Sequence, residues 1–155
     1  MNNSFSAAAA GRVTTTRRFF SRETTVSTLI AAAPATVWAL LIDAAGYTRW
    51  NSTVTSLQGE IVPGGQLALK SILDEKRVFK LRVKEFVPEK RLVWGDSQGS
   101  RVYELVPAGP GQTRFTMTEK IGGPFFPLFA RFIPPFDEVF SQFAADLKQA
   151  AEAAV

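Results

Sequence analysis

Residues 34–43 read PATVWALLID, and this stretch decides the fold of the chain. An apolar segment, residues 26–33, leads into Pro34, whose missing N–H and fixed φ suit the first turn of a helix. The apolar residues that follow at helical spacing are Val37, Trp38, Leu41 and Ile42. The sequence therefore predicts an abrupt change from a strand to a helix.

Two large aromatic residues follow this helix closely. Gly46 ends the helical stretch and leaves Tyr47 and Trp50 on a second, short segment that Asn51 closes. Aromatic residues so near a helix end suggest a cover over one end of the interior. For Asp43, Trp50 and Asn51 we expect roles in capping and packing rather than in catalysis.

Length and composition favour one globular domain. A chain of 155 residues is long enough for a single core, and a domain of this size buries roughly 68–70% of its unfolded surface. Apolar residues make up 46% and charged residues 21%, which excludes a disordered protein. No apolar run approaches the roughly 20 residues that span a bilayer, so we expect no stable membrane insertion.

The net charge of +4 is concentrated at the N-terminus. The first 21 residues contain three arginines and no acid, so residues 22–155 carry 15 basic and 14 acidic groups. This balance argues against a nucleic-acid partner. We predict a flexible basic leader over residues 1–21 and a single domain over residues 22–155. The leader lacks the apolar core of a secretory signal, and we expect a cytoplasmic protein.

Cysteine and histidine are both absent. Their absence excludes a disulfide framework, a thiol nucleophile, the Ser-His-Asp triad and the commonest metal ligands. Any catalysis must use carboxylates, Lys, Arg, Tyr or water. We therefore expect no metal and no cofactor.

The middle of the chain is typical of antiparallel strands joined by turns. Turn residues such as Pro63-Gly64-Gly65 and Pro88-Glu89-Lys90 separate the apolar runs. The predicted strands cover residues 22–33, 54–62, 66–73, 76–87, 91–95, 100–107 and 112–121. The charged residues of 76–84 alternate with apolar ones, which favours a solvated strand face over a nucleic-acid site.

The last third changes to a helical period. Its apolar stripe consists of Phe136, Phe140, Phe143 and Leu147. The stripe predicts a long amphipathic helix, and Pro134-Pro135 either starts this helix or kinks an earlier helical turn within residues 124–132. Together these elements predict an α+β helix-grip fold. In it, a curved antiparallel sheet of about seven strands wraps around the C-terminal helix, with two short helices after the first strand.

The chain resembles a known family over residues 24–152. The matching positions are Pro34, Val37-Trp38, Asp43, Tyr47, Trp50-Asn51, Gly59-Glu60, Gly64, Leu92-Val93-Trp94, Thr113-Arg114-Phe115, Glu119 and Gly122. They resemble the SRPBCC superfamily with its START-like fold, and more closely its polyketide cyclase/dehydrase and lipid-transport branch. The resemblance implies a deep hydrophobic cavity between the sheet and the long helix, used for lipids, sterols, polyketides or hormones.

The last hairpin gives the sharpest prediction of a site. A turn at residues 108–111 pairs Pro107 with Thr113, and the period of two then places one row of side chains on a common face. The cross-strand pairs on this face are Leu105 with Phe115, Tyr103 with Met117, and Arg101 with Glu119. The opposite face is mostly polar. We therefore expect the apolar row to point inward, with Arg101 and Glu119 at its far end.

Arg101 and Glu119 are expected to pair, because a buried guanidinium is costly unless a carboxylate satisfies it. One interpretation makes the pair a polar anchor for a ligand's carboxylate, hydroxyl or carbonyl group. The other makes it a structural ion pair at the sheet rim. Arginine is too basic to shuttle protons, so we assign no catalytic residue.

The predicted function is binding or carriage of a small hydrophobic ligand, such as a lipid or polyketide, by a monomer. The predicted ligand-binding residues are Arg101, Tyr103, Leu105, Phe115, Met117, Glu119, Phe79, Trp94, Phe136, Phe140 and Phe143. The first alternative is a lyase-like polyketide cyclase or dehydratase that uses the same cavity. The second is an interaction protein that presents its basic leader, or the aromatic entrance at residues 122–127, to a partner or a membrane surface.

Overall fold

The computed structural model describes residues 11–155 and contains one sheet of eight antiparallel strands in the order β1-β2-β8-β7-β6-β5-β4-β3. The strands are β1 (Arg12–Arg17), β2 (Ser21–Ile30), β3 (Val54–Gly59), β4 (Gln66–Ser71), β5 (Asp74–Val87), β6 (Arg91–Gly95), β7 (Gly99–Gly109) and β8 (Gln112–Gly122). The helices are α1 (Pro34–Ile42), α2 (Tyr47–Trp50), α3 (Phe126–Phe129) and α4 (Asp137–Ala153), with 3-10 turns η1 (Ala44–Gly46) and η2 (Ala130–Phe132).

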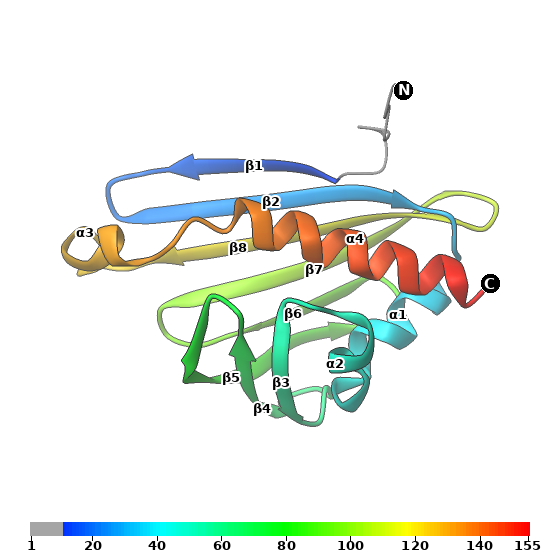
Figure 1. Ribbon diagram of the computed structural model, residues 1–155, viewed down its shortest axis with the longest axis horizontal. Helices are drawn as coiled ribbons and strands as arrows, with labels where there is room; N and C mark the ends of the chain where they lie inside the picture. Colours follow the sequence, from blue (N-terminus) through cyan, green and yellow to red (C-terminus); the bar gives the residue numbers. More distant parts are fainter. Residues whose placement is uncertain (1–10) are drawn as a thin grey trace, which may run out of the picture.

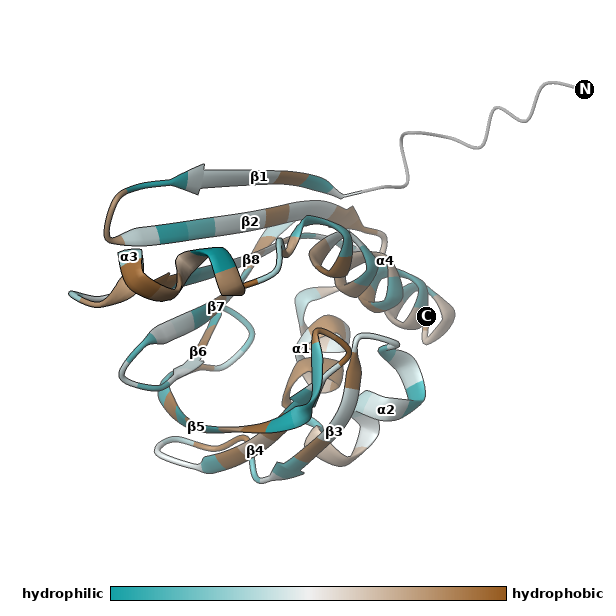
Figure 2. Cartoon of the chain, turned by 60° about the vertical axis from the view of Figure 1, so that its left-hand side comes forward, coloured by the Kyte–Doolittle hydropathy of each residue, from teal (hydrophilic) through white to brown (hydrophobic). Residues whose placement is uncertain are grey.

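The sheet curls around α4, and the predicted helix-grip fold is confirmed. Figure 1 shows α4 lying across the concave side of the sheet, with α1 and α2 at its C-terminal end and α3 at the other end. The 60° rotation in Figure 2 shows the strands from β1 to β3 bending around the helices. No helix among residues 11–155 combines the length and the apolar character needed to cross a membrane.

The eighth strand comes from the segment that the sequence predicted to be flexible. Residues 12–17 form β1, which pairs with β2 in the register Thr14↔Thr25. The Thr15 hydroxyl also donates a hydrogen bond of 2.7 Å to Asp137 Oδ1. The prediction of a flexible leader is therefore wrong for these residues, because their β-branched side chains suit a strand and β2 offers a free edge. Residues 1–10 lie outside the described part of the chain.

The segment of residues 34–51 closes one end of the core as predicted. Pro34 stands in the first turn of α1, and Asp43 accepts a hydrogen bond from the backbone N–H of Gly46. The Tyr47 hydroxyl donates to the Leu41 carbonyl at 2.6 Å. The Trp50 ring packs against Phe143 with centroids 5.8 Å apart. These contacts confirm the structural roles expected for this segment.

Aromatic side chains fill the space between α4 and the sheet. Phe140, Phe143 and Leu147 of α4 are fully or almost fully buried. The Phe143 ring lies 5.8 Å from the Tyr103 ring and 6.4 Å from the Phe115 ring, centroid to centroid. Most of the length of α4 therefore packs directly on the sheet. The resemblance implied a cavity between the sheet and the long helix, and a cavity is present at one end of the fold, next to the start of α4.

Candidate ligand-binding site

A cavity of about 230 Å³ lies at the end of the sheet opposite α1 and α2. The ends of β4 to β8 form its floor and walls, and the segment from α3 to the start of α4 covers it. Its main apolar residues are Leu69, Leu73, Phe79, Leu81, Trp94, Ile121, Phe129, Phe132, Ile133 and Phe136. Its polar residues are Ser71, Asp74, Arg77, Asp96, Gln98, Arg101 and Glu119. The site therefore combines apolar walls with one charged region.

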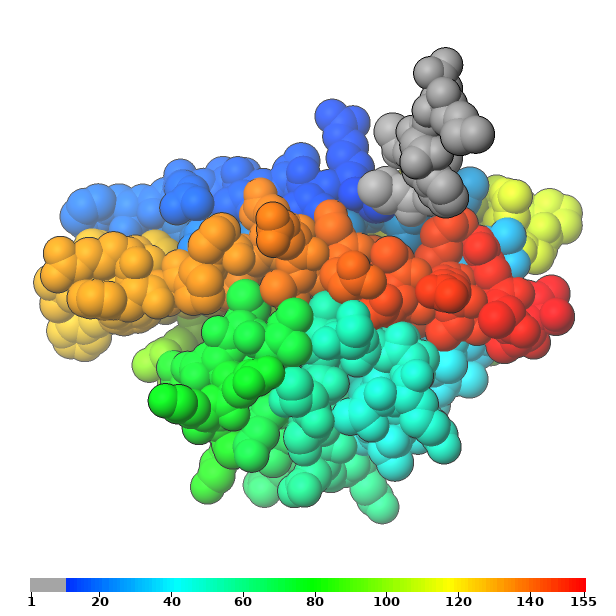
Figure 3. Space-filling model, in the orientation of Figure 1, coloured from blue at the N-terminus to red at the C-terminus, as the bar shows by residue number. Residues whose placement is uncertain are grey.

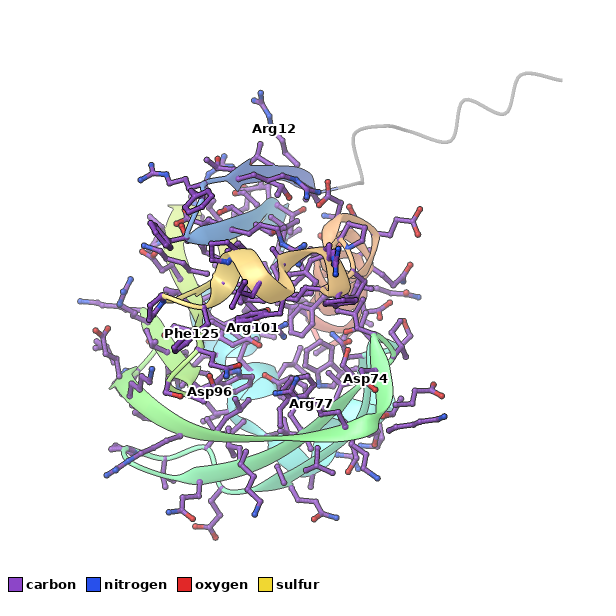
Figure 4. The ribbon with its side chains drawn as sticks, turned by 90° about the vertical axis from the view of Figure 1, so that its left-hand side faces the viewer. Arg12, Asp74, Arg77, Asp96, Arg101 and Phe125 are labelled. Atoms are coloured by element: carbon purple, nitrogen blue, oxygen red, sulfur yellow. The ribbon has the colours of Figure 1, made fainter. Side chains whose placement is uncertain are left out.

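Figure 4 faces this end of the molecule and shows Asp74, Arg77, Asp96 and Arg101 in the region between α3 and β5. Arg77 comes from β5, and its guanidinium lies 4.6 Å from the centre of the Phe79 ring. Asp96 belongs to the β6–β7 turn, where its Oδ1 accepts hydrogen bonds from the backbone N–H groups of Gln98 and Gly99. These charged residues belong to strand ends and turns that only the folded sheet brings together.

Arg101 and Glu119 form the predicted pair at the inner wall of the cavity. The register of β7 and β8 places them opposite each other. Nη2 and Nε of Arg101 donate to the same Glu119 oxygen, Oε2, at 2.7 and 3.1 Å. The side chains are only 13% and 21% exposed. Both bonds go to Oε2, and Oε1 forms no hydrogen bond with another residue within 11–155.

Tyr103 and two rings of α4 surround the guanidinium. Nη1 of Arg101 donates to the Tyr103 hydroxyl at 3.5 Å, and the guanidinium carbon lies 5.2 Å from the centre of the Phe140 ring and 5.9 Å from that of Phe143. Such packing against aromatic faces favours a desolvated cation. The position of Arg101 is therefore set from the sheet side and from the helix side.

Burial and the neighbouring charges shift the pKa of Arg101 in opposite directions. Desolvation is the largest single effect and lowers the pKa of Arg101, but the attraction of Glu119 and the hydrogen bonds and charge interactions with Glu119 and Tyr103 together outweigh it, so the pKa is raised overall. Burial raises the pKa of Tyr103 to about 12, against the opposing effect of Arg101. Both groups therefore keep their protons near neutral pH. Arg101, which lines the cavity, is suited to orienting or polarising an oxygen atom there but not to exchanging protons with it.

The structure brings five of the eleven predicted site residues to the cavity: Arg101, Glu119, Phe79, Trp94 and Phe136. The six that do not line it are Tyr103, Leu105, Phe115, Met117, Phe140 and Phe143. All six point inward as the sequence predicted, but the four from β7 and β8 and the two from α4 are buried against one another. Here the structure differs from the prediction, because the rings of α4 occupy the space in front of the hairpin.

Sequence reasoning missed the charged rim and the cover of the cavity. Asp74, Arg77 and Asp96 lie at strand ends and turns, where polar residues are ordinary and carry no signal of a site. Phe129 and Phe132 come from α3 and η2, just after the glycine-rich segment that the sequence singled out as an entrance. The cluster of phenylalanines in that segment was the available signal for a cover.

The chemistry of the cavity suits an amphipathic small molecule. Three carboxylates and two arginines belong to its lining, and Arg101 is already neutralised by Glu119. Its volume lies below the roughly 300–1,000 Å³ of pockets for drug-sized ligands. Within residues 11–155, no group of three or more acidic side chains lies close enough to hold a metal ion. The cavity therefore fits a small ligand, or one end of a longer one.

The family model described as polyketide cyclase/dehydrase and lipid transport matches residues 21–152. Among the described elements, this range covers the helices up to the penultimate residue of α4 and every strand except β1. No curated protein matches the sequence.

Solved structures resemble the fold of this chain over most of its length. A conserved protein of unknown function from Enterococcus faecalis has a TM-score of 0.68 and 18% identity, covering 92% of this chain and 78% of its own. A START superfamily protein from Mycobacterium smegmatis has a TM-score of 0.64 and 18% identity, covering 86% and 99%. A norcoclaurine synthase point mutant from Thalictrum flavum has a TM-score of 0.64 and 13% identity, covering 93% and 100%. At these identities the similarity concerns the fold alone.

Proposed function

Because the chain belongs to the polyketide cyclase/dehydrase and lipid transport family, we propose that it binds a small hydrophobic ligand in the cavity beneath α3. The observation that carries this proposal is the Arg101–Glu119 pair, which presents hydrogen-bonding atoms at the wall of a cavity lined by leucine, isoleucine and aromatic side chains. Ligand pockets commonly combine apolar walls with a few polar groups that set the ligand's orientation. The apolar part of the ligand would contact Leu81, Ile133 and their neighbours.

The polar end of the ligand is a neutral hydroxyl or carbonyl group. Glu119 already neutralises Arg101, and among the other charged lining residues Asp74 and Asp96 outnumber Arg77, so the cavity does not favour an anion. A ligand hydroxyl can donate to Oε1 of Glu119, which no described residue engages. A ligand carbonyl can accept from the guanidinium of Arg101.

We favour binding or carriage over a cyclase or dehydratase reaction. Such a reaction needs a group that gives or takes a proton, and the raised pKa values of Arg101 and Tyr103 keep both groups protonated. Glu119 is engaged by two donors of Arg101. These three residues are better suited to holding the polar end of a ligand than to transferring a proton.

Native mass spectrometry of protein purified from its own cells tests the proposal. We expect a mass above that of the chain, lost after extraction with organic solvent, and a hydrophobic molecule in the extract. Ile133→Trp fills the cavity and should abolish the extra mass. Val106→Trp, at an exposed position of β7 distant from the cavity lining, should retain it. A wild-type protein without bound molecule, or equal loading of both variants, would contradict the proposal.

The double variant Arg101→Leu/Glu119→Leu separates an anchoring role from a structural one. Replacing both members of a buried pair with apolar residues often leaves stability unchanged, whereas removing one member does not. We expect the double variant to fold but to lose the ligand that the wild type carries. A folded double variant that retains the same ligand would show that the pair is structural only.

A further inference from the structure

The end of the molecule that holds the cavity also exposes large apolar side chains. We name this set the aromatic patch: Phe19, Phe20, Phe125, Leu128 and Phe132, each between 55% and 73% exposed. Phe19 and Phe20 lie in the turn between β1 and β2, and the other three lie in or next to α3 and η2. Exposed apolar side chains that gather in this way mark an interaction surface.

The two segments that carry the patch are adjacent in space. The backbone N–H of Gly123 donates to the Phe20 carbonyl at 3.1 Å. A surface groove runs between the segments, with Arg17, Arg18 and Phe19 among its residues on one side and Phe126, Pro127 and Ala130 on the other. Figures 1 and 3 show the β1–β2 turn and α3 together at the same extreme end of the molecule.

The patch lies in a basic environment. Residues 17–22 and 122–136 contain four arginines and no acidic residue, and the next residues along the chain are Glu23 and Asp137. Arg22 is occupied within the fold, where it donates to the carbonyl oxygens of Ile133 and Pro134 at 3.2 and 2.8 Å. Arg17, Arg18 and Arg131 are exposed beside the patch. The surface therefore combines projecting apolar side chains with positive charge.

We propose that the aromatic patch docks on the surface of an anionic lipid bilayer. The phenylalanines and Leu128 enter the boundary between headgroups and acyl chains, while Arg17, Arg18 and Arg131 contact lipid phosphates. A second copy of the chain fits this surface poorly, because self-association would bring arginines against arginines. Docking would place Phe132, which belongs to both the patch and the cavity lining, at the membrane surface.

This proposal goes beyond ligand binding and does not depend on the identity of the ligand. Its test is sedimentation of the full chain with two kinds of vesicle, phosphatidylcholine alone and phosphatidylcholine mixed with phosphatidylglycerol. We expect binding to the mixed vesicles, which added salt weakens, and little binding to the neutral ones. Vesicle binding is measured without added ligand, so its failure leaves the proposed cavity function untouched.

Paired variants locate the contact. Phe125→Ser/Leu128→Ser and Arg17→Gln/Arg18→Gln should each weaken binding to the mixed vesicles by roughly tenfold or more. Leu29→Ser/Val106→Ser removes two exposed apolar side chains near the opposite end of the sheet, and Lys80→Gln/Arg82→Gln removes two charges from β5. Both of these control variants should bind like the wild type.

Four results would overturn the proposal. The first is absence of binding to the mixed vesicles, and the second is equal binding to neutral vesicles. The third is an equal loss of binding in patch and control variants, which would indicate general charge attraction. The fourth is a wild-type dimer that the patch variant converts to a monomer, which would assign the patch to a second copy of the chain.

Discussion

Arg101 on β7 and Glu119 on β8 are joined by two hydrogen bonds to a single carboxylate oxygen, with Nη2 and Nε 2.7 and 3.1 Å from Oε2. Glu119 also lines the cavity, and its other carboxylate oxygen, Oε1, forms no hydrogen bond within residues 11–155. The Arg101–Glu119 pair therefore has two roles. It neutralises a guanidinium between Tyr103 and the α4 rings, and it offers the cavity its polar wall.

Removing the charge of Glu119 should destabilise the fold. Glu119→Gln leaves the largely buried guanidinium of Arg101 without its counter-ion, and we expect a loss of roughly 2–3 kcal/mol in the free energy of unfolding, allowing for partial exposure. Chemical denaturation measures this loss. The control is Arg49→Gln, which breaks the exposed pair with Asp43 and should cost less than about 1 kcal/mol. Equal losses of unfolding free energy in the two variants would show that burial does not strengthen the effect of breaking the Arg101–Glu119 pair.

The two tyrosines of the chain should not ionise at their usual pH in the folded protein. Burial raises the pKa of Tyr103 to about 12 and that of Tyr47 well above its ordinary value of 10.0. We therefore expect little tyrosinate absorbance between pH 10 and 11 while the protein stays folded, and a sharp rise on unfolding. Tyrosinate absorbance that appears near pH 10 without loss of helical circular dichroism would contradict this prediction.

The same shift makes stability depend on alkaline pH. Because the folded pKa of Tyr103 lies above the unfolded value, its contribution is fully present below about pH 10 and is lost as pH rises toward 12. A shift of this size corresponds to on the order of 2–3 kcal/mol. In Tyr103→Phe, the free energy of unfolding should fall less steeply over this range than in the wild type. Identical slopes would exclude Tyr103 as the titrating group.

The Phe143 side chain fills the space between α4 and the inner face of the sheet. Phe143→Ala removes a buried ring that contacts Trp50, Tyr103 and Phe115, and we expect a loss of about 3–5 kcal/mol. Phe125→Ala removes an exposed ring and should change stability by less than about 0.5 kcal/mol. Thermal unfolding of both variants measures the contrast. A small loss for Phe143→Ala would mean that this part of the interior is not tightly packed.

Gly59 should tolerate no side chain. Its φ is 108°, and a Cβ atom there would lie 2.2 Å from the Gln66 carbonyl oxygen, so Gly59→Ala should cost roughly 3 kcal/mol. The matched control is Gly111→Ala, with φ of 64° and no atom within 4 Å of the Cβ position, which should cost about 1–2 kcal/mol. Similar melting temperatures for the two variants would show that the ends of β3 and β4 can separate where Gly59 faces Gln66.

The sequence determined the fold, the register of the last hairpin and the pairing of Arg101 with Glu119. These features depend on local rules, namely proline at a helix start, alternation along strands and the length of one turn. The sequence also indicated an aromatic interior, because phenylalanine recurs at helical spacing in α4.

Which of the inward-facing residues border open space depends on the packing of the whole fold. Alternation places Leu105, Phe115 and Met117 on the inner face, but whether that face meets a cavity or a packed ring depends on how closely α4 approaches the curved sheet. The cavity formed instead where α4 has not yet begun and α3 covers the strand ends. The charged residues of its lining and the aromatic patch beside it join segments far apart in the chain, so the local pattern indicated only the aromatic segment at residues 122–127. Close packing is a property of all the elements together, which is why the site followed from the assembled sheet and helix.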